Sequence, residues 1–364
     1  MADLWDNPIQ TDGFEFVEYA APDPKALGGL FERMGFRAVA RHRHKDVLLY
    51  KQGDVNFILN AEPRSFAQNF ARRHGPSVCA MAFRVKDAAA AYEKLVQNGA
   101  WGVEAHTGPG ELNIPAIKGI GDSLIYLVDR YPANAFGNTI YDVDFRPLPG
   151  FEAFWRREAA APEGAGLALV DHLTHNVHRG RMQEWAEFYE RLFHFREIRY
   201  FDIEGKLTGL KSKAMTSPCG RIRIPINESA DDRSQIQEYL DQYHGEGIQH
   251  IALHTNDIYR TVDSLRGNGV ELLDTPDTYY ELVERRLPGH GEPLDELRRR
   301  RILIDGAPGG GKLLQIFTKT MVGPIFFEII QRKGDEGFGE GNFRALFESM
   351  ELDQVRRGVL QPAP

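Results

Sequence analysis

The sequence has few cysteines, no long apolar run and no dense block of basic residues. Its two cysteines, Cys79 and Cys219, are too few for a disulfide framework and lack the spacing of a cysteine metal site. We therefore expect both to be buried thiols in a reduced, cytoplasmic protein. No run approaches the roughly 20 apolar residues that span a bilayer, and the amino terminus lacks the apolar core of a signal peptide. We expect no membrane partner.

The charge balance argues against another class of partner. Lys and Arg total 44 against 52 for Asp and Glu, which gives a formal charge of −8. An acidic chain without a basic patch does not attract a phosphate backbone, so we expect no nucleic-acid partner. The apolar fraction of 42% and the charged fraction of 26% are typical of a globular protein.

The element order β-α-β-β recurs along the chain. In the first half, strand patterns at residues 14–19 and 77–85 each precede a helical pattern. In the second half, strand patterns at 169–177 and 247–255 do the same. The sequence therefore predicts an internal duplication of α+β class, in which each half is itself a pair of similar modules.

A stretch rich in proline, glycine, alanine and charge separates the two halves. We expect a linker at 151–166, an N-terminal domain at 1–150 and a C-terminal domain at 167–364. From Asn342 onward, apolar residues are spaced for one face of a helix, which predicts a terminal helix.

Aligning the two halves by hand compares their strands position by position. The alignment sets three residues of the first half opposite three of the second: Ala80 opposite His250, Tyr126 opposite Glu328, and, more loosely, Phe16 opposite His172. The first half thus lacks ligand atoms where the second has two imidazoles and a carboxylate. We expect a single site, in the second half.

Two imidazoles and a carboxylate on three strands form the ligand set of non-haem Fe(II) oxygenases. This arrangement leaves coordination positions open for substrate and dioxygen, whereas a structural zinc site closes them, usually with cysteines. The alternative is that three polar residues lie on separate strands by chance, because ligands from distant strands form no local motif. Spacing alone leaves both interpretations open.

The remaining histidines are assigned other roles. Strand alternation turns His175 away from the face of His172, which predicts a supporting or structural role. His254 shares the face of His250 but lies about 13 Å along the strand, too far to be a co-ligand. Four others are predicted to be solvated surface residues: His42, His44, His74 and His244.

Residues 306–313 match part of the sequence motif of a phosphate-binding loop. They fit its first seven positions, but Leu313 stands where a Ser or Thr must bind magnesium, and a strand pattern follows where a helix is required. We expect a hairpin connection here and no nucleotide site.

Several runs of sequence together resemble the 4-hydroxyphenylpyruvate dioxygenase family. They are Val-Asp-His-Leu-Thr-His-Asn-Val around His172, Gly-Ile-Gln-His at 247–250, Leu-Leu-Gln-Ile-Phe at 313–317, Phe-Phe-Glu-Ile-Ile-Gln-Arg at 326–332, and Gly-Phe-Gly-Glu-Gly-Asn-Phe at 337–343. The resemblance covers the whole second half and, more weakly, the first. It implies two halves that are each a pair of βαβββ vicinal-oxygen-chelate modules forming an open barrel.

By this resemblance, His172, His250 and Glu328 bind one Fe(II) per chain. The substrate's own 2-oxo acid group would take the place of a separate 2-oxoglutarate. The implied reaction converts 4-hydroxyphenylpyruvate and dioxygen to homogentisate and carbon dioxide, by oxidative decarboxylation, ring hydroxylation and side-chain migration, in tyrosine catabolism. A homo-oligomer, dimer or tetramer, is a further expectation from the family.

The resemblance also implies the contacts to substrate. The catalytic contacts map onto Ser212, Asn227, Gln249 and Gln315. The substrate-binding contacts map onto Gln235, Pro225, Phe317, Phe326, Phe338, Asn342, Phe343 and Leu346. Ideal alternation turns Gln249 away from the face of His250, and a twist or bulge would be needed to bring it back. Phe317 and Phe343 would sandwich the aromatic ring, and the terminal helix would be a lid.

Three other functions remain open at this point. A 4-hydroxymandelate synthase uses the same substrate and metal, but that family differs at the positions of Pro225 and Phe343, and both are of the homogentisate-forming type here. An extradiol ring-cleaving dioxygenase could use the same three ligands. A metal-free binding protein on the same scaffold would have no need of them.

Overall fold

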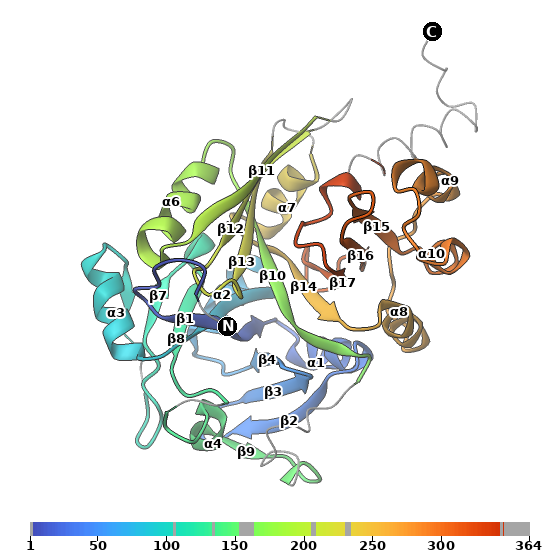
Figure 1. Cartoon of the computed structure of the whole chain (residues 1–364). Coiled ribbons are helices and arrows are strands. Elements are labelled where there is room, and N and C mark those ends of the chain that lie inside the picture. Colours follow the sequence, from blue (N-terminus) through green and yellow to red (C-terminus); the bar gives the residue numbers. More distant parts are fainter. Residues whose placement is uncertain are drawn as a thin grey trace.

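The protein is described from a computed structural model. Its described residues are 3–104, 107–132, 135–152, 164–204, 209–229, 234–342 and 345. They form two curled sheets that lie side by side, the first half running from blue to green and the second from light green to red in Figure 1. The predicted duplication and fold class are confirmed. The predicted linker falls mostly on residues 153–163, and the terminal helix on residues beyond 345, outside the described part of the chain.

The first half contains a sheet in the order β6-β7-β8-β5-β1-β4-β3-β2-β9. Its elements are β1 (Thr11–Ala20), α1 (Pro24–Arg33), β2 (Arg37–His42), β3 (Val47–Gln52), β4 (Val55–Asn60), α2 (Phe66–His74), β5 (Ser77–Val85), α3 (Ala88–Gln97), β6 (Gly102–Val103), β7 (Ala116–Lys118), the 3-10 helix η1 (Ile120–Asp122), β8 (Leu124–Val128), α4 (Ile140–Asp144) and β9 (Phe145–Pro147).

The second half contains a sheet in the order β11-β12-β13-β10-β14-β17-β16-β15. Its elements are β10 (Leu167–Val177), α6 (Met182–Phe193), β11 (Arg196–Glu204), β12 (Gly209–Thr216), β13 (Arg223–Ser229), α7 (Gln235–Tyr243), β14 (Gly247–Thr255), α8 (Ile258–Gly267), α9 (Asp277–Arg286), α10 (Leu294–Arg300), β15 (Leu303–Gly306), β16 (Lys312–Phe317) and β17 (Phe326–Lys333).

Equivalent helices of the two halves begin at equivalent capping residues. Asp87 accepts a hydrogen bond from the backbone amide of Ala90 at 2.9 Å, and Asp257 accepts one from Arg260 at 3.1 Å. An aspartate at this position satisfies an amide that has no partner within the helix. The same local signal therefore starts α3 and α8 and anchors the alignment of the halves.

The two halves also share three register shifts between their central strands, and two of these are β-bulges next to the candidate ligand positions. In β1 the extra residue is Glu15, because Phe14 and Phe16 on either side of it pair with adjacent residues of β5. In β10 the extra residue is Asp171, because Val170 and His172 pair with adjacent residues of β14. In β5 and β14 the extra residues are Cys79 and Gln249. A bulge puts two residues of one strand opposite one of its neighbour and redirects side chains.

The interiors of the two half-barrels differ. In the first half, side chains of α4 and β9, among them Ile140, Tyr141 and Phe145, pack against Phe16 of β1 and fill the curve of the sheet. In the second half the corresponding space is an open cavity in front of the candidate ligands. Among the described residues, this space is therefore filled in the first half and open in the second.

The two halves are joined by one continuous apolar core. Phe57 of β4 faces Phe327 of β17 with ring centroids 6.0 Å apart. Buried Gln52 accepts hydrogen bonds from the backbone amides of Ala165 at 2.7 Å and Leu167 at 3.1 Å, and donates one to Met34 at 3.0 Å. These contacts tie the start of the second half to the first sheet.

Two local predictions from the sequence can be compared with the structure. Gly306 and Lys312 are paired ends of the β15–β16 hairpin, as expected in place of a phosphate-binding loop. His74, in contrast, is buried and not solvated: its ring stacks on Tyr243 and its Nδ1 lies 2.6 Å from the Tyr243 carbonyl oxygen. Helix packing between the halves covers it, which local sequence does not report. Both cysteines are buried free thiols, as predicted.

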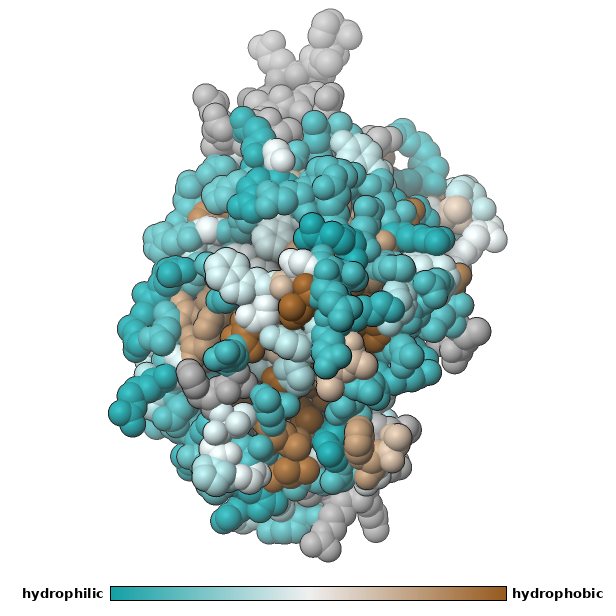
Figure 2. Space-filling model, turned by 90° about the vertical axis from the view of Figure 1, so that its left-hand side faces the viewer, coloured by the Kyte–Doolittle hydropathy of each residue, from teal (hydrophilic) through white to brown (hydrophobic). Residues whose placement is uncertain are grey.

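The surface on the side of α3 and α6 is hydrophilic over most of its area, with apolar residues in separate patches (Figure 2). Among described residues, Trp101 is the most exposed of the large hydrophobic side chains, at 78%. No helix in the described ranges has the length and apolar character that crossing a membrane requires.

Candidate metal centre and substrate cavity

The three candidate ligands converge from the central strands of the second sheet. His172 lies on β10, His250 on the adjacent antiparallel β14, and Glu328 on β17, which runs parallel to β14. All three are buried, and one potential ligand atom from each lies within 4.8 Å of the others. Glu328 Oε2 is 3.2 Å from His172 Nε2 and 3.4 Å from His250 Nε2. This donor set fits a metal ion with an open coordination face.

Each ligand side chain is held by a neighbour at the atom that faces away from the centre. His172 Nδ1 lies 2.8 Å from Asp171 Oδ1, and His250 Nδ1 lies 3.0 Å from Gln249 Oε1. The amide of Gln315 donates to Glu328 Oε1 at 3.1 Å. The remaining atoms, the two Nε2 nitrogens and Oε2, point to a common centre.

The electrostatics of the site favour a bound cation. Burial would raise the pKa of Glu328, but the imidazoles of His172 and His250 outweigh it and lower this pKa to about 2. Burial lowers the pKa of His250, although Glu328 opposes the shift. Glu328 is therefore a carboxylate and His250 tends to the neutral form, which are protonation states that bind a metal. Burial would lower the pKa of His172, but Glu328 and Asp171 outweigh it and raise this pKa, so a bound metal would take the place of the proton on Nε2.

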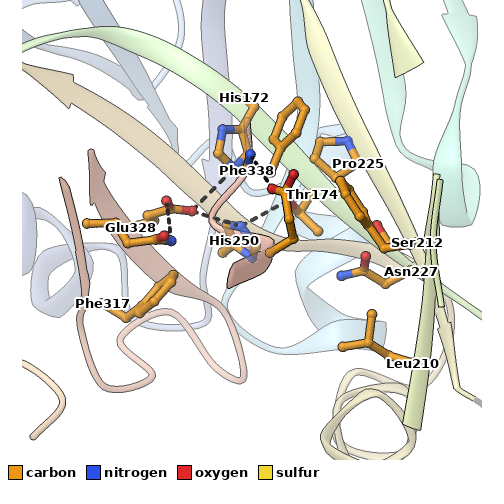
Figure 3. Close-up of a pocket in the computed structure, with 13 residues that line it drawn as sticks. His172, Thr174, Leu210, Ser212, Pro225, Asn227, His250, Phe317, Glu328 and Phe338 are labelled. Atoms are coloured by element: carbon orange, nitrogen blue, oxygen red, sulfur yellow. Dashed lines mark hydrogen bonds and ion pairs between the residues drawn. The ribbon is translucent and has the colours of Figure 1, made fainter. Parts of the chain in front are cut away.

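The cavity opens directly in front of these ligands (Figure 3). The residues that line it are His172, Thr174, Phe201, Leu210, Ser212, Pro225, Asn227, His250, Gln315, Phe317, Glu328, Phe338 and Glu340. The cavity therefore has a buried ionisable end and a mixed polar and apolar remainder, as small-molecule sites commonly do.

One wall of the cavity is polar and uncharged. Ser212 of β12 and Asn227 of β13 are directly paired across the two strands, and both side chains face the cavity on the side away from Glu328 (Figure 3). Pro225 lies two residues before Asn227 on the same strand and also lines the cavity. A hydroxyl and an amide can donate to or accept from a neutral polar group without adding charge.

Aromatic rings flank the ligands. Phe326 stacks on the His250 ring at 4.9 Å between centroids, and Phe317 meets Phe326 edge to face at 6.0 Å. Phe338 lies edge to face on His172 at 5.3 Å. Phe326 and Phe338 thus pack against the two ligand histidines, and Phe317 and Phe338 also face the cavity.

A buried hydrogen-bond chain supports Gln315 from behind. The Asn342 amide donates to Gln315 Oε1 at 2.7 Å, and Tyr279 of α9 donates to Asn342 Oδ1 at 2.6 Å. Through Gln315 this chain reaches Glu328. Asn342 is thus behind the cavity wall and not on it.

The structure does not bring every predicted residue to the cavity. Gln235 is exposed at the start of α7 and does not line the cavity. Gln249 points to His250, because it is the extra residue of the β14 bulge. Phe343 and Leu346 lie outside the described residues.

Sequence reasoning missed five residues of this region, which are Asp171, Thr174, Phe201, Leu210 and Glu340. Thr174 shares the face of His172 by alternation, and that signal could have identified it. Its hydroxyl lies 2.9 Å from His250 Nε2. The others depend on contacts between strands or segments far apart in sequence.

Comparison with known proteins agrees with this geometry. A family model described as the N-terminal part of hydroxyphenylpyruvate dioxygenase matches residues 5–146. A model of the glyoxalase, bleomycin resistance protein and dioxygenase superfamily matches residues 169–282. The two matches fall on the two halves.

Whole-chain relatives are similarly consistent. The chain is 61% identical to a 4-hydroxyphenylpyruvate dioxygenase of Pseudomonas aeruginosa, over 97% of each chain. It is 60% identical to hemolysin VllY of Vibrio vulnificus, over 98% of this chain and 99% of the relative. It is 52% identical to a 4-hydroxyphenylpyruvate dioxygenase of Legionella pneumophila, over 98% of each.

Two solved structures share the fold. A fusion of a xylose isomerase-like TIM barrel with 4-hydroxyphenylpyruvate dioxygenase matches with a TM-score of 0.77 and 36% identity, over 95% of this chain and 54% of the fusion. A triple mutant of 4-hydroxymandelate synthase from Streptomyces coelicolor matches with a TM-score of 0.79 and 26% identity, over 95% of this chain and 99% of that one. The chain belongs to the 4-hydroxyphenylpyruvate dioxygenase family.

Proposed function

We propose that this chain converts 4-hydroxyphenylpyruvate and dioxygen to homogentisate and carbon dioxide. The observation that carries the proposal is the convergence of His172, His250 and Glu328 at the inner end of an aromatic-lined cavity with an uncharged polar wall. Family membership adds the substrate class. One chain would act on one aromatic 2-oxo acid at a time, because the equivalent space of the first half is filled.

We propose that His172, His250 and Glu328 hold one Fe(II). Two imidazoles and one carboxylate with open positions are typical of Fe(II) oxygenases, and no thiolate that would favour zinc lies in the site. When bound, Fe(II) would supply the redox chemistry of dioxygen, and the substrate's own 2-oxo acid group would take the place of a separate 2-oxoglutarate.

The chain's own residues would bind and orient the substrate. Asn227 and Ser212 offer hydrogen-bond partners to the phenol end without charge. Phe317 provides an apolar face for the aromatic ring, a contact worth about 1 kcal/mol beyond area burial. Gln315 acts at the other end, where it holds the carboxylate of Glu328 in place.

The same site would suit a 4-hydroxymandelate synthase, and one solved relative is a variant of such an enzyme. The two reactions share substrate and metal but place the oxygen on different carbon atoms. Pro225, which lines the cavity, is the described residue that favours the homogentisate-forming type by resemblance. The product therefore distinguishes the two functions.

The test is to incubate the purified chain with Fe(II), ascorbate and 4-hydroxyphenylpyruvate under air and to identify the products. We expect homogentisate and one equivalent of carbon dioxide, and no product under nitrogen. Formation of 4-hydroxymandelate, or no turnover with iron bound, would contradict the proposal.

Three broader expectations remain proposals. We propose that residues 1–150 form a metal-free domain and residues 167–364 a catalytic domain of the same vicinal-oxygen-chelate type, joined by a linker at 151–166; the shared bulges support this division. We also propose that the chain forms a homo-oligomer and acts in the cytoplasm. Light scattering of the purified protein measures the oligomeric state, and cell fractionation tests the location.

A further inference from the structure

We propose that Asp171 and Gln249 are positioning residues, which use the two β-bulges to fix the ring orientation of His172 and His250. The inference rests on the proposed function, since it concerns how the same centre is organised. In each case the residue immediately before a ligand histidine is the extra residue of a bulge and carries the side-chain oxygen next to Nδ1.

The bulges are what make these contacts possible. In a regular strand, consecutive side chains point to opposite faces, so Asp171 could not reach the ring of His172. Val170 and His172 instead pair with the adjacent residues Leu253 and Ala252, which leaves Asp171 without a partner opposite it. The redirected carboxylate lies 2.8 Å from His172 Nδ1.

The contact at His172 decides which nitrogen faces the centre. A carboxylate only accepts hydrogen bonds, so Asp171 holds the proton of His172 on Nδ1 and leaves Nε2, which faces Glu328, as the nitrogen that would bind the metal. Such partners orient metal-binding histidines and raise their basicity. Gln249 Oε1 can accept from His250 Nδ1 in the same way, while the Thr174 hydroxyl faces Nε2.

Asp171 is itself held by Arg332 of β17. The guanidinium donates to both carboxylate oxygens at 2.7 Å, a two-point contact that fixes the plane of the carboxylate. Arg332 also donates to the Gly337 carbonyl at 2.7 Å and lies over the Phe338 ring, 5.8 Å from its centroid. Because Phe338 packs on His172, the pair Asp171–Arg332 supports this ligand from two sides.

In the first half, Glu15 occupies the position that is equivalent to Asp171 and serves as a comparison. Glu15 is the extra residue of the equivalent bulge and pairs with Arg84 at 2.5 Å, but Phe16 follows it in place of a histidine. A buried acid paired with an arginine therefore occurs at this bulge in both halves, although Arg84 lies on β5 and Arg332 on β17. Only in the second half does the acid also contact a ligand, so the two roles can be separated by experiment.

The test measures Fe(II) affinity of the metal-free chain by anaerobic competition with a chelator. We expect Asp171→Ala to lower the affinity by 10- to 100-fold, and Asp171→Asn, which keeps an acceptor for Nδ1–H, to lower it by less than tenfold. Glu15→Gln should lower the melting temperature and leave Fe(II) affinity unchanged. Equal affinities for Asp171→Ala and Glu15→Gln would overturn the inference.

Two further measurements guard against loss of the fold. Gln249→Leu changes the half-buried extra residue of the β14 bulge. We expect this variant to keep a native circular-dichroism spectrum and to bind Fe(II) several-fold more weakly. An unchanged affinity would overturn the role of Gln249. In Zn(II)-loaded protein, a proton resonance of His172 Nδ1–H should be present in the wild type and absent in Asp171→Ala; its persistence counts against the inference.

The outcome is independent of turnover. Wild-type chain that binds Fe(II) but makes no homogentisate would contradict the proposed reaction, while the difference in affinity between Asp171→Ala and Glu15→Gln would still support positioning. Homogentisate formation with equal affinities would contradict positioning alone.

Discussion

At the residue scale, Glu328 shows how the candidate ligands are prepared. One carboxylate oxygen faces both imidazoles, and the other accepts from Gln315. A carboxylate held at both oxygens loses little conformational freedom when it binds a cation. Its pKa of about 2 keeps it charged at neutral pH.

His250 is the ligand whose replacement best separates metal binding from folding. We expect His250→Ala to abolish stoichiometric Fe(II) binding and turnover, because two remaining ligands do not complete the facial set. The natural control is His254→Ala on the same strand, since His254 is partly exposed and faces Asn256. Iron content by mass spectrometry and product formation are the measurements, and retained iron in His250→Ala would refute the ligand assignment.

Gly339 is required by its position against Gln315. Its φ is +79°, and a Cβ atom there would collide with the Gln315 side-chain amide. We expect Gly339→Ala to displace Gln315 from Glu328 and so to misplace this carboxylate. The expected fall in kcat is at least tenfold, which corresponds to about 1.4 kcal/mol of activation free energy.

Gly334→Ala is the control for Gly339→Ala. Its φ is +87°, so backbone strain is similar, but a Cβ would meet only Gly311 at 3.5 Å. Steady-state kinetics on both variants separate backbone strain from the clash, and equal activities would show that the contact with Gln315 is unimportant.

At the element scale, β10 presents different chemistry to its two faces. His172 and Thr174 face the cavity, whereas His175 is buried in the core, where its Nε2 lies 2.7 Å from the hydroxyl of Tyr189 on α6. Burial lowers the pKa of His175 to about 3. This histidine therefore stays neutral in the folded protein at physiological pH.

The buried His175 should make the protein sensitive to acid. Its folded pKa lies below the unfolded value near 6.5, so the stability it contributes is present above pH 6.5 and is lost as the pH falls toward 3. Between pH 7.5 and 5.5 this loss is about 1.4 kcal/mol. Over this pH range, we expect the unfolding free energy of His175→Gln to fall by about 1.4 kcal/mol less than that of the wild type.

Urea unfolding of wild type and His175→Gln at both pH values is the measurement. Because other groups titrate in both proteins, only the difference between them reports on His175. An identical pH dependence would show that His175 does not stay neutral in the folded state.

At the scale of the whole molecule, the two halves are coupled through Gln52. This buried amide accepts from two backbone N–H groups of the second half and donates to the carbonyl of Met34 in the first. We expect Gln52→Met to lower the unfolding free energy by about 3 kcal/mol, because buried backbone groups lose their partners. Gln97→Met on the exposed face of α3 should change it by less than about 0.5 kcal/mol.

Urea unfolding followed by tryptophan fluorescence and circular dichroism measures both variants. The continuous core predicts that wild-type transitions from the two signals coincide, as for a single cooperative unit. Equal stabilities of Gln52→Met and Gln97→Met would show that these hydrogen bonds do not couple the halves.

Several features of the fold and site could be predicted because their signals are local. The capping residues Asp87 and Asp257 start equivalent helices, and counting from them places Ala80 opposite His250, as the strand pairings also do. The burial of His74 could not be predicted, because it depends on packing against α7 of the other half.

By itself, the sequence determined the duplication, because a repeated order of strands and helices is a local signal. Together with the family resemblance, it also predicted the three residues that the structure brings together in the second half. Only the tertiary structure decided that Asp171 and Gln249 turn toward the ligands and that Arg332 holds Asp171. A bulge depends on how two strands pair, and Asp171 meets Arg332 across 161 residues of chain. Alternation within one strand cannot predict either contact.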